Sequence, residues 1–299
     1  MSDLPRCTND GSDCAPRLVP FLNLGGLEDL PESSSGYALA QADLPDQLKQ
    51  IRDAGFEGVQ HWCEPHVVEA VQQSDLLFTV TGGVRENGDA DQQVGEAKAC
   101  GAECITVHAG WGLESDDRMD ELVDEILAAE EAHGIGCYVE THRSTMTQDN
   151  FRTAQLSRRR PRLGFNGDFS HWYTGLEMPY AGVNRVMAAT ENVFDRVRHF
   201  HGRIGNSGCI QVDIGPDLET ALGRPNVQDF VTMWTRAFRG FKQAAGPGDW
   251  LAFAPELLKP EINYARTFSG PDGKPREEGD RWQQALLYLE LANHCWDQA

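Results

Sequence analysis

The sequence predicts a single α/β domain folded as a closed (β/α)8 TIM barrel. Short apolar segments, many of them rich in β-branched residues, alternate with amphipathic helical patterns along most of the 299 residues, which is typical of parallel strands joined by helices. Eight such strand segments can be counted, the number that closes this barrel. The length agrees as well, because barrels of this type commonly have about 250 residues. An open, doubly wound sheet is the alternative, but the sequence has no GxGxxG or P-loop motif.

The sequence divides into a polar, flexible N-terminal tail at 1–16 and a barrel domain at 17–299. Each expected strand is short and apolar enough to be covered on both faces. In chain order the strands are expected at Arg17–Leu22, Gly58–Trp62, Leu76–Thr81, Cys104–His108, Gly136–Glu140, Arg162–Asp168, Val197–His201 and Trp250–Pro255.

Helical patterns lie between these strands. The clearest is Asp117–His133, where apolar residues recur at the spacing of one buried helix face and Gly134 provides a stop. Two stretches, 172–190 and 257–280, are predicted to be long turn-rich connections. Because long loops are commonly functional covers, we expect both to cover the end of the barrel. Further helices are expected at Leu44–Ala54, Asn226–Ala244 and Asp280–Trp296.

The composition excludes several classes of partner. The chain has 46 acidic and 26 basic residues and a net charge of −20, so it does not complement a phosphate backbone and no nucleic-acid partner is expected. No apolar run approaches the roughly 20 residues that span a bilayer, so no membrane partner is expected. The first residues lack the apolar core of a signal peptide, which predicts a cytoplasmic protein. Strand-like surroundings favour buried thiols at Cys63, Cys104, Cys137 and Cys209.

Polar side chains end four consecutive expected strands: Glu140 in YVETHR, Asp168 in FNGDFSHW, His201 in FHGRIG and Glu256 in FAPEL. The carboxyl ends of barrel strands meet at one end of the barrel, so we expect these side chains to converge. Three carboxylates brought together would repel one another, and a cation resolves the repulsion. A solvated polar rim is the alternative. We predict one divalent cation, with Mn²⁺ as the first choice and Mg²⁺, Co²⁺ and Zn²⁺ as alternatives, because this donor set suits all four.

The other candidate residues lie within or next to these strand ends and their connections. His171, three residues after Asp168, would orient that carboxylate or contact the substrate. Trp62 would either pack in the core or offer an aromatic wall for the face of a sugar ring. His199 shares a strand face with His201 and is interpreted as a core histidine. The full set of companions is Trp62, His108, His142, Arg143, His171, Arg203 and Gln211.

From Leu18 to about Leu291 the chain resembles the xylose-isomerase-like TIM-barrel superfamily of sugar isomerases, epimerases and their relatives. The resemblance lies in a Glu after the fifth strand, Asp-x-x-His after the sixth, a His after the seventh and a Glu after the eighth. The runs ETHR, D-x-SHW and HGRIG look like the sugar phosphate isomerase/epimerase branch. The resemblance implies a small sugar-like substrate, and related barrels often form homo-oligomers. The matching residues are Glu140, Asp168 with His171, His201 and Glu256.

The chain also departs from two branches of that superfamily. Ketose 3-epimerases place a further Glu six residues after the fifth-strand ligand, where this chain has Met146. The DNA-repair endonuclease branch binds zinc through additional histidines, one of which would fall on Gly215, two residues after Asp213. The missing ligands and the charge of −20 argue against abasic-site repair.

The resemblance implies a metal-dependent isomerase or epimerase that acts on a hydroxy-carbonyl compound through an enediolate. Glu140 and Glu256 are the candidates for moving the α-proton, and His108 or His142 would act as the acid. A lyase or dehydratase acting on a keto-sugar, an inosose or a 3-keto-glycoside is the main alternative, because the same enediolate can expel a neighbouring substituent. A non-catalytic sugar-binding barrel and an abasic-site endonuclease rank below it. Substrate oxygens would be held by Arg143, Arg203 and Gln211.

Overall fold

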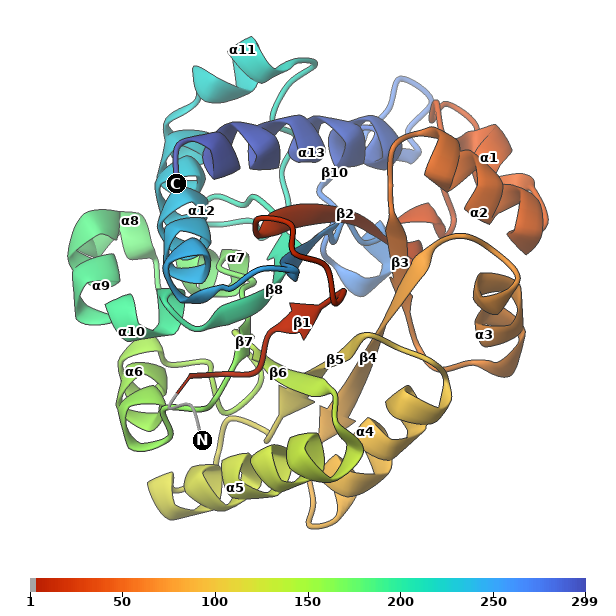
Figure 1. Ribbon diagram of the computed structural model, residues 1–299. Helices are drawn as coiled ribbons and strands as arrows, with labels where there is room; N and C mark the ends of the chain where they lie inside the picture. Colours follow the sequence, from red (N-terminus) through yellow and green to blue (C-terminus); the bar gives the residue numbers. More distant parts are fainter. Residues whose placement is uncertain (1–3) are drawn as a thin grey trace.

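The computed structural model describes residues 4–299, and these form a closed barrel of parallel strands surrounded by helices (Figure 1). The strands follow one another around the barrel in chain order, and β9 pairs with both β8 and β2, which closes the barrel. The predicted TIM barrel is therefore confirmed. The barrel strands are β2 (Arg17–Asn23), β3 (Gly58–His61), β4 (Leu77–Val84), β5 (Cys104–Ala109), β6 (Gly136–Glu140), β7 (Phe165–Asn166), β8 (Val197–Gly202) and β9 (Asp249–Pro255).

The helices form an outer ring, in which the C-terminal helix lies beside α12 (Figure 1). The four helices expected from periodicity form with their ends shifted by no more than one residue. In α5, the Ser115 side chain caps the first turn by accepting the N–H of Arg118, and Gly134 ends the helix at a φ of 76°. The main helices are α1 (Tyr37–Gln41), α2 (Leu44–Asp53), α3 (Pro65–Gln72), α4 (Asp89–Ala99), α5 (Asp116–His133), α6 (Asn150–Arg159), α11 (Leu218–Leu222), α12 (Pro225–Ala244) and α13 (Arg281–Asp297).

Alternate residues of each strand face the helices and the barrel interior. In β5, Ile105 and Val107 belong to the apolar core, whereas Thr106 points inward, where its hydroxyl accepts a hydrogen bond from Gln60 of β3. The strands β3 and β5 are not neighbours, so this contact crosses the barrel. The interior is therefore polar below the strand ends that carry the candidate site.

Part of the predicted tail is placed against the barrel. The short strand β1 (Thr8–Asn9) pairs antiparallel with β9, and the Thr8 hydroxyl lies 3.2 Å from the hydroxyl of Tyr138. Residues 1–3 of the tail lie outside the described residues. The division of the chain at residue 17 and the flexibility of the tail stay predictions.

The two long connections contain more regular structure than the sequence indicates. Residues 172–190 were predicted to be turn-rich, but they are largely helical, because Met178, Val183 and Met187 bury one side against the core. The helices are short because turns interrupt them, including one at Gly182 with a φ of 87°. Residues 257–280 include a 3-10 turn, η2 (Pro260–Ile262), and a hairpin of β10 (Thr267–Ser269) and β11 (Pro275–Glu277). The inserted helices are α7 (Ser170–Gly175), α8 (Met178–Ala181), α9 (Val183–Ala189) and α10 (Glu191–Phe194).

The cysteines only partly follow the prediction. Cys104 and Cys137 are buried free thiols as expected, and Cys209 is partly exposed. The expectation of a thiol at Cys63 was wrong, because Cys63 forms a disulfide with Cys100, the residue that caps the end of α4. Within residues 4–299, no helix has both the length and the apolar character needed to cross a bilayer.

The buried Glu130 of α5 makes stability depend on pH. Its carboxylate accepts a hydrogen bond from the Cys137 N–H at 2.7 Å. Burial raises its pKa from 4.5 to about 7, although that hydrogen bond and nearby arginines oppose the rise. Because the folded-state pKa lies above the unfolded value, the native state binds the extra proton. The free energy of unfolding therefore falls as the pH rises from 4.5 through about 7.

We expect Glu130→Gln to unfold with a free energy higher than that of the wild type at about pH 8, by on the order of 3 kcal/mol, and to lose most of this advantage near about pH 5. Glutamine keeps the acceptor for the Cys137 N–H and removes the buried charge. Urea unfolding across this pH range measures the difference, and Glu131→Gln, at the exposed neighbouring position, is the control. A difference that does not change with pH would contradict the assignment.

Candidate metal centre

Four side chains from different strand ends converge at the C-terminal end of the barrel. Glu140 is the last residue of β6, His201 lies near the end of β8, Glu256 follows β9, and Asp168 lies between β7 and α7. Each offers one ligand atom, and all these atoms lie within 4.8 Å of one another. Glu140, Asp168 and His201 are buried, while Glu256 is partly exposed. The structure thus brings together the four residues that the sequence nominates as metal ligands.

The donors are arranged as a cation would require. Nδ1 of His201 lies 3.2 Å from Glu140 Oε2 and 3.4 Å from Glu256 Oε2. Glu140 Oε1 and His201 Nδ1 are both buried, and neither has a hydrogen-bond partner. Buried polar atoms are normally satisfied. Two unpartnered atoms within one set of three carboxylates and an imidazole fit a divalent cation with oxygen and nitrogen ligands.

The guanidinium of Arg203 also lies within this set. Its Nη2 is 2.5 Å from Asp168 Oδ2 and donates a second short hydrogen bond to Glu256 Oε2. The side chain is buried and lies 4.5 Å from the ring of Tyr264. Arg203 therefore provides positive charge to two of the carboxylates and shares their oxygens with any cation bound there. The expected role of Arg203, to hold substrate oxygens, stays a prediction.

The charges of the centre are tightly coupled. Burial alone would raise the pKa of Glu140, but His108 and His201 lower that pKa well below its usual range. Burial alone would lower the pKa of His201, yet Glu256 and Glu140 raise it to about 10. Burial raises the pKa of Asp168 to about 6 despite the opposing charge of Arg203. The centre thus balances anionic carboxylates with its own cationic side chains.

Gln60 of β3 fixes the orientation of His201. The Gln60 Oε1 lies 2.7 Å from His201 Nε2 and also accepts a hydrogen bond from the Asn23 amide. Gln60 Nε2 donates to the hydroxyl of Thr106, which sets the orientation of the amide. Because Oε1 can only accept, His201 Nε2 carries a proton, and Nδ1 is the nitrogen turned toward the carboxylates. Such support of a ligating imidazole is common in metal sites.

We expect Gln60→Leu to weaken divalent-cation binding by about 10–100-fold, the usual cost of losing such a supporting contact. Calorimetric titration with Mn²⁺ measures the affinity. Thr79→Val is the matched control, because Thr79 neighbours Gln60 on β4 and its buried hydroxyl has no hydrogen-bond partner. An unchanged affinity in Gln60→Leu would exclude the positioning role.

Asn166 supports Glu140 in a comparable way. Its Nδ2 donates to Glu140 Oε2 at 3.0 Å, and its Oδ1 lies 3.1 Å from His199 Nδ1. His199 is fully buried inside the barrel, which confirms its interpretation as a core histidine. This chain of contacts holds Oε2 of Glu140 in place, while Oε1 forms no hydrogen bond.

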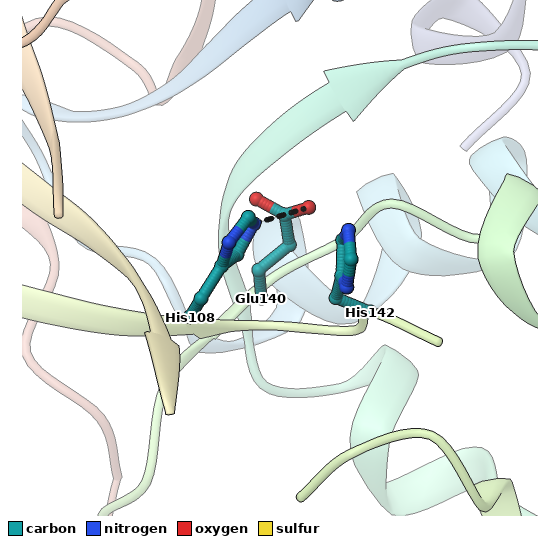
Figure 2. Close-up of side chains that lie close together, drawn as sticks. All are labelled: His108, Glu140 and His142. Carbon is teal, nitrogen blue, oxygen red and sulfur yellow. Dashed lines mark ion pairs between the residues drawn. The ribbon is translucent and has the colours of Figure 1, made fainter. Parts of the chain in front are cut away.

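Three imidazoles lie next to one another beside Glu140, with their rings tilted. His108 Nε2 lies 3.3 Å from Glu140 Oε1, and Figure 2 shows His108 and His142 on either side of that carboxylate. The ring centres are 4.3 Å apart between His108 and His142 and 3.8 Å apart between His142 and His171. Burial alone would lower the pKa of His108, but the charge of Glu140 raises it. Glu140 thus stabilises the protonated form of His108.

His142 differs from its neighbour in protonation. Burial lowers the pKa of His142 to about 4, so the ring is neutral near neutral pH. Its Nδ1 accepts the Ser144 N–H at 3.1 Å, which places the proton on Nε2, 3.4 Å from the Tyr264 hydroxyl. Although His108, Glu140 and His142 lie close enough to hold an ion, His142 has no free lone pair to offer. His142 therefore acts as a hydrogen-bond donor.

The remaining candidates lie around this centre. His171 is buried, with Nε2 3.5 Å from Asp168 Oδ2 and 3.8 Å from Glu140 Oε1. Arg143 is exposed, with its guanidinium 5.6 Å from the Tyr264 ring, and Trp62 is 53% exposed just after β3. Both ends of the Gln211 amide bond the backbone of Leu258. Gln211 therefore holds the connection after β9 in place, and its contact with substrate stays a prediction.

Sequence reasoning missed three residues that shape the centre, namely Gln60, Asn166 and Tyr264. The first two lie inside strands, where a single polar residue has no distinctive pattern. The feature that could have identified them is a polar side chain among apolar neighbours, in GVQHW and LGFNGD. Tyr264 comes from the long connection after β9 and contacts His142 and Arg203, which its sequence position does not indicate.

The sequence matches no protein-family model and no curated protein. Solved structures of the same fold include a xylose-isomerase-like TIM-barrel protein from Mycobacterium smegmatis in complex with magnesium, with 14% identity, coverage of 96% of this chain and 98% of that chain, and a TM-score of 0.53. A sugar phosphate isomerase/epimerase from Parabacteroides distasonis has 12% identity, coverage of 94% and 97%, and a TM-score of 0.52. A probable 3-DHS dehydratase from Bacillus anthracis has 15% identity, coverage of 91% and 97%, and a TM-score of 0.53.

These comparisons show that the chain has the fold of a (β/α)8 barrel. More narrowly, its fold is that of xylose-isomerase-like TIM-barrel proteins, as the sequence resemblance implies. At identities this low the likeness concerns the fold, and function has to be argued from the residues of the centre.

Proposed function

We propose that the protein is a divalent-metal-dependent isomerase or epimerase of a sugar or a related hydroxy-carbonyl compound. The observation that carries this proposal is the convergence of four donor atoms within 4.8 Å, two of them buried without hydrogen-bond partners. Glu140, Asp168, His201 and Glu256 would hold the cation. Fold neighbours that include an isomerase/epimerase and a magnesium complex support the same class of enzyme.

A cation at this centre would supply Lewis-acid stabilisation of the negative charge on the oxygens of an enediolate. The chain's own residues would move the protons. Glu140 and Glu256 face His201 Nδ1 from two strands, and one of them would take the α-proton while the other returns it to a different face or carbon. His108, whose protonated form Glu140 stabilises, would donate a proton to substrate oxygen, and the Nε2–H of His142 would bind a second oxygen.

Elimination is the second candidate reaction. Met146 occupies the position at which related 3-epimerases have a further Glu, and it is buried in the core. The chain therefore lacks one acid–base group that a symmetrical proton exchange would use. With His108 as proton donor to the leaving oxygen, the same enediolate would lose a hydroxyl or a glycosidic group. A probable dehydratase among the fold neighbours agrees with this alternative.

Incubation of the Mn²⁺-loaded protein in D₂O with a panel of ketoses, inososes and 3-keto-glycosides tests the proposal. We expect one substrate to gain deuterium at a carbon next to its carbonyl, and mass spectrometry separates the outcomes. A deuterated isomer supports isomerase or epimerase activity, whereas loss of water or of the aglycone supports elimination. A protein that binds Mn²⁺ stoichiometrically but exchanges no proton in the whole panel would be a binding barrel, and the proposal would fail.

A further inference from the structure

Arg85 lies next to the candidate metal centre, although it is not one of its ligands. Arg85 directly follows β4. Val84 is buried in the apolar core, so Gly83 and Arg85, on either side of it, face the interior of the barrel. Gly83 is paired in register with His108. A methyl group added at Gly83 would have its nearest neighbours at 3.8 Å, in the His108 carbonyl, and at 4.0 Å, in Arg85 Nε. The missing side chain therefore leaves room for at least a methyl group beside Arg85.

The guanidinium of Arg85 forms no ion pair within 4.0 Å among residues 4–299, although the charges of Glu114 and Asp89 act on it from farther away. One of its nitrogens, Nη1, is buried and forms no hydrogen bond. The two nearby carboxylates are engaged elsewhere: Asp89 accepts the backbone N–H groups of Arg85 and Glu86, and Glu114 accepts those of Trp111 and Gly112. A buried donor without a partner is costly, so this group is free to bind a ligand.

An aromatic surface adjoins this cation. The Arg85 guanidinium lies 4.4 Å from the ring of Trp111, which is 61% exposed, and such stacking holds the guanidinium in a fixed orientation. Arg143, on the connection after β6, also forms no ion pair among the described residues. In a chain with a net charge of −20, two unpaired arginines beside one centre indicate an anionic ligand.

We propose that Arg85 and Trp111 form a subsite for an anionic group at the far end of the substrate, so that the substrate is a sugar acid or a sugar phosphate. This inference rests on the proposed function for the position of the reacting end. The space beside Gly83 would accept the carbon chain between the carbonyl at the metal centre and the anion at Arg85. A carboxylate or a phosphate would pair with the planar guanidinium through two parallel hydrogen bonds.

The test is calorimetric titration of the full-length protein with D-glucose 6-phosphate, D-glucuronate and D-glucose, in Mg²⁺ and again after chelation. We expect one anionic sugar to bind more tightly than glucose under both conditions, and Arg85→Gln to remove this preference by about tenfold or more. Whichever anion binds more tightly identifies the source as phosphate or carboxylate. Gly83→Val, which keeps the charge and fills the space, should weaken binding similarly.

Arg185→Gln removes the same charge at an exposed position in α9 and should bind as the wild type does. Anionic sugars that bind no more tightly than glucose would overturn the subsite, and so would a preference that survives Arg85→Gln. The titration after chelation needs no cation. It therefore tests the anion subsite separately from the metal-dependent function. If the protein prefers anionic sugars but exchanges no proton with any substrate of the panel, only the metal-dependent function would be refuted.

Discussion

Replacement of Glu140 by glutamine should abolish both cation binding and turnover. Glu140 contributes to the donor set, contacts His108 and accepts a hydrogen bond from Asn166, so a neutral amide removes a ligand and a candidate base together. We expect turnover to fall by about a thousandfold or more, since a general base alone is commonly worth about 10²–10⁴-fold. Glutamine has nearly the same shape, and the fold should persist.

The measurements are Mn²⁺ binding by calorimetry and deuterium incorporation into the substrate that the wild type uses. Glu130→Gln is the matched control, because Glu130 is equally buried but lies on α5 and belongs to neither group of candidate ligands. It should bind Mn²⁺ as the wild type does. Stoichiometric, tight Mn²⁺ binding by Glu140→Gln would show that the cation, if it acts in catalysis, is held elsewhere.

Arg203→Met should give a protein whose stability depends on a divalent cation. Removing the guanidinium leaves Asp168 and Glu256 close together without their shared cationic partner. Breaking a buried ion pair by deleting one partner commonly costs about 3–5 kcal/mol. We expect a loss of this size in chelator, measured by urea unfolding. A bound cation neutralises the same carboxylates, so added Mn²⁺ should restore much of the loss.

Arg281→Met provides the comparison. Arg281 is also buried and pairs with Glu277, with further hydrogen bonds to Gly26 and Glu28 carbonyls, but it is not among the candidate ligands. Its loss should destabilise the protein to the same extent with and without Mn²⁺. If Mn²⁺ rescues neither variant, or both alike, then Arg203 does not share its carboxylates with the cation.

The strands and the candidate ligands were predictable because both follow from local pattern. Short apolar runs alternate with periodic helices, and each run ends at a residue that a barrel brings to one rim. The topology alone therefore predicts that the four candidate ligands converge, without knowledge of any side-chain contact. These ligands are Glu140, Asp168, His201 and Glu256. The bounds of α5 could be predicted in the same way, because its apolar face is regular and Gly134 ends the helix.

Contacts across the barrel could not be predicted in this way. Gln60 meets His201 across 141 positions of the chain, and this pairing depends on how β3 and β8 are rotated in the closed barrel. Arg203 has the same difficulty, since an arginine two residues after a ligand could face substrate as readily as carboxylates. The helical insertion at 172–190 escaped prediction because its glycines and proline suggested turns, while its buried methionines became informative only with the core in place.

The hairpin of β10 and β11 has a practical consequence for experiments in solution. Its strands are almost wholly exposed and pair only with each other, yet the same connection carries Tyr264 to the candidate metal centre. A fluorophore attached at Asp272, in the turn between the two strands, would lie outside the barrel and would leave every ligand intact. Its fluorescence would report whether this hairpin moves when a ligand is added, and so whether the end of the barrel opens in solution.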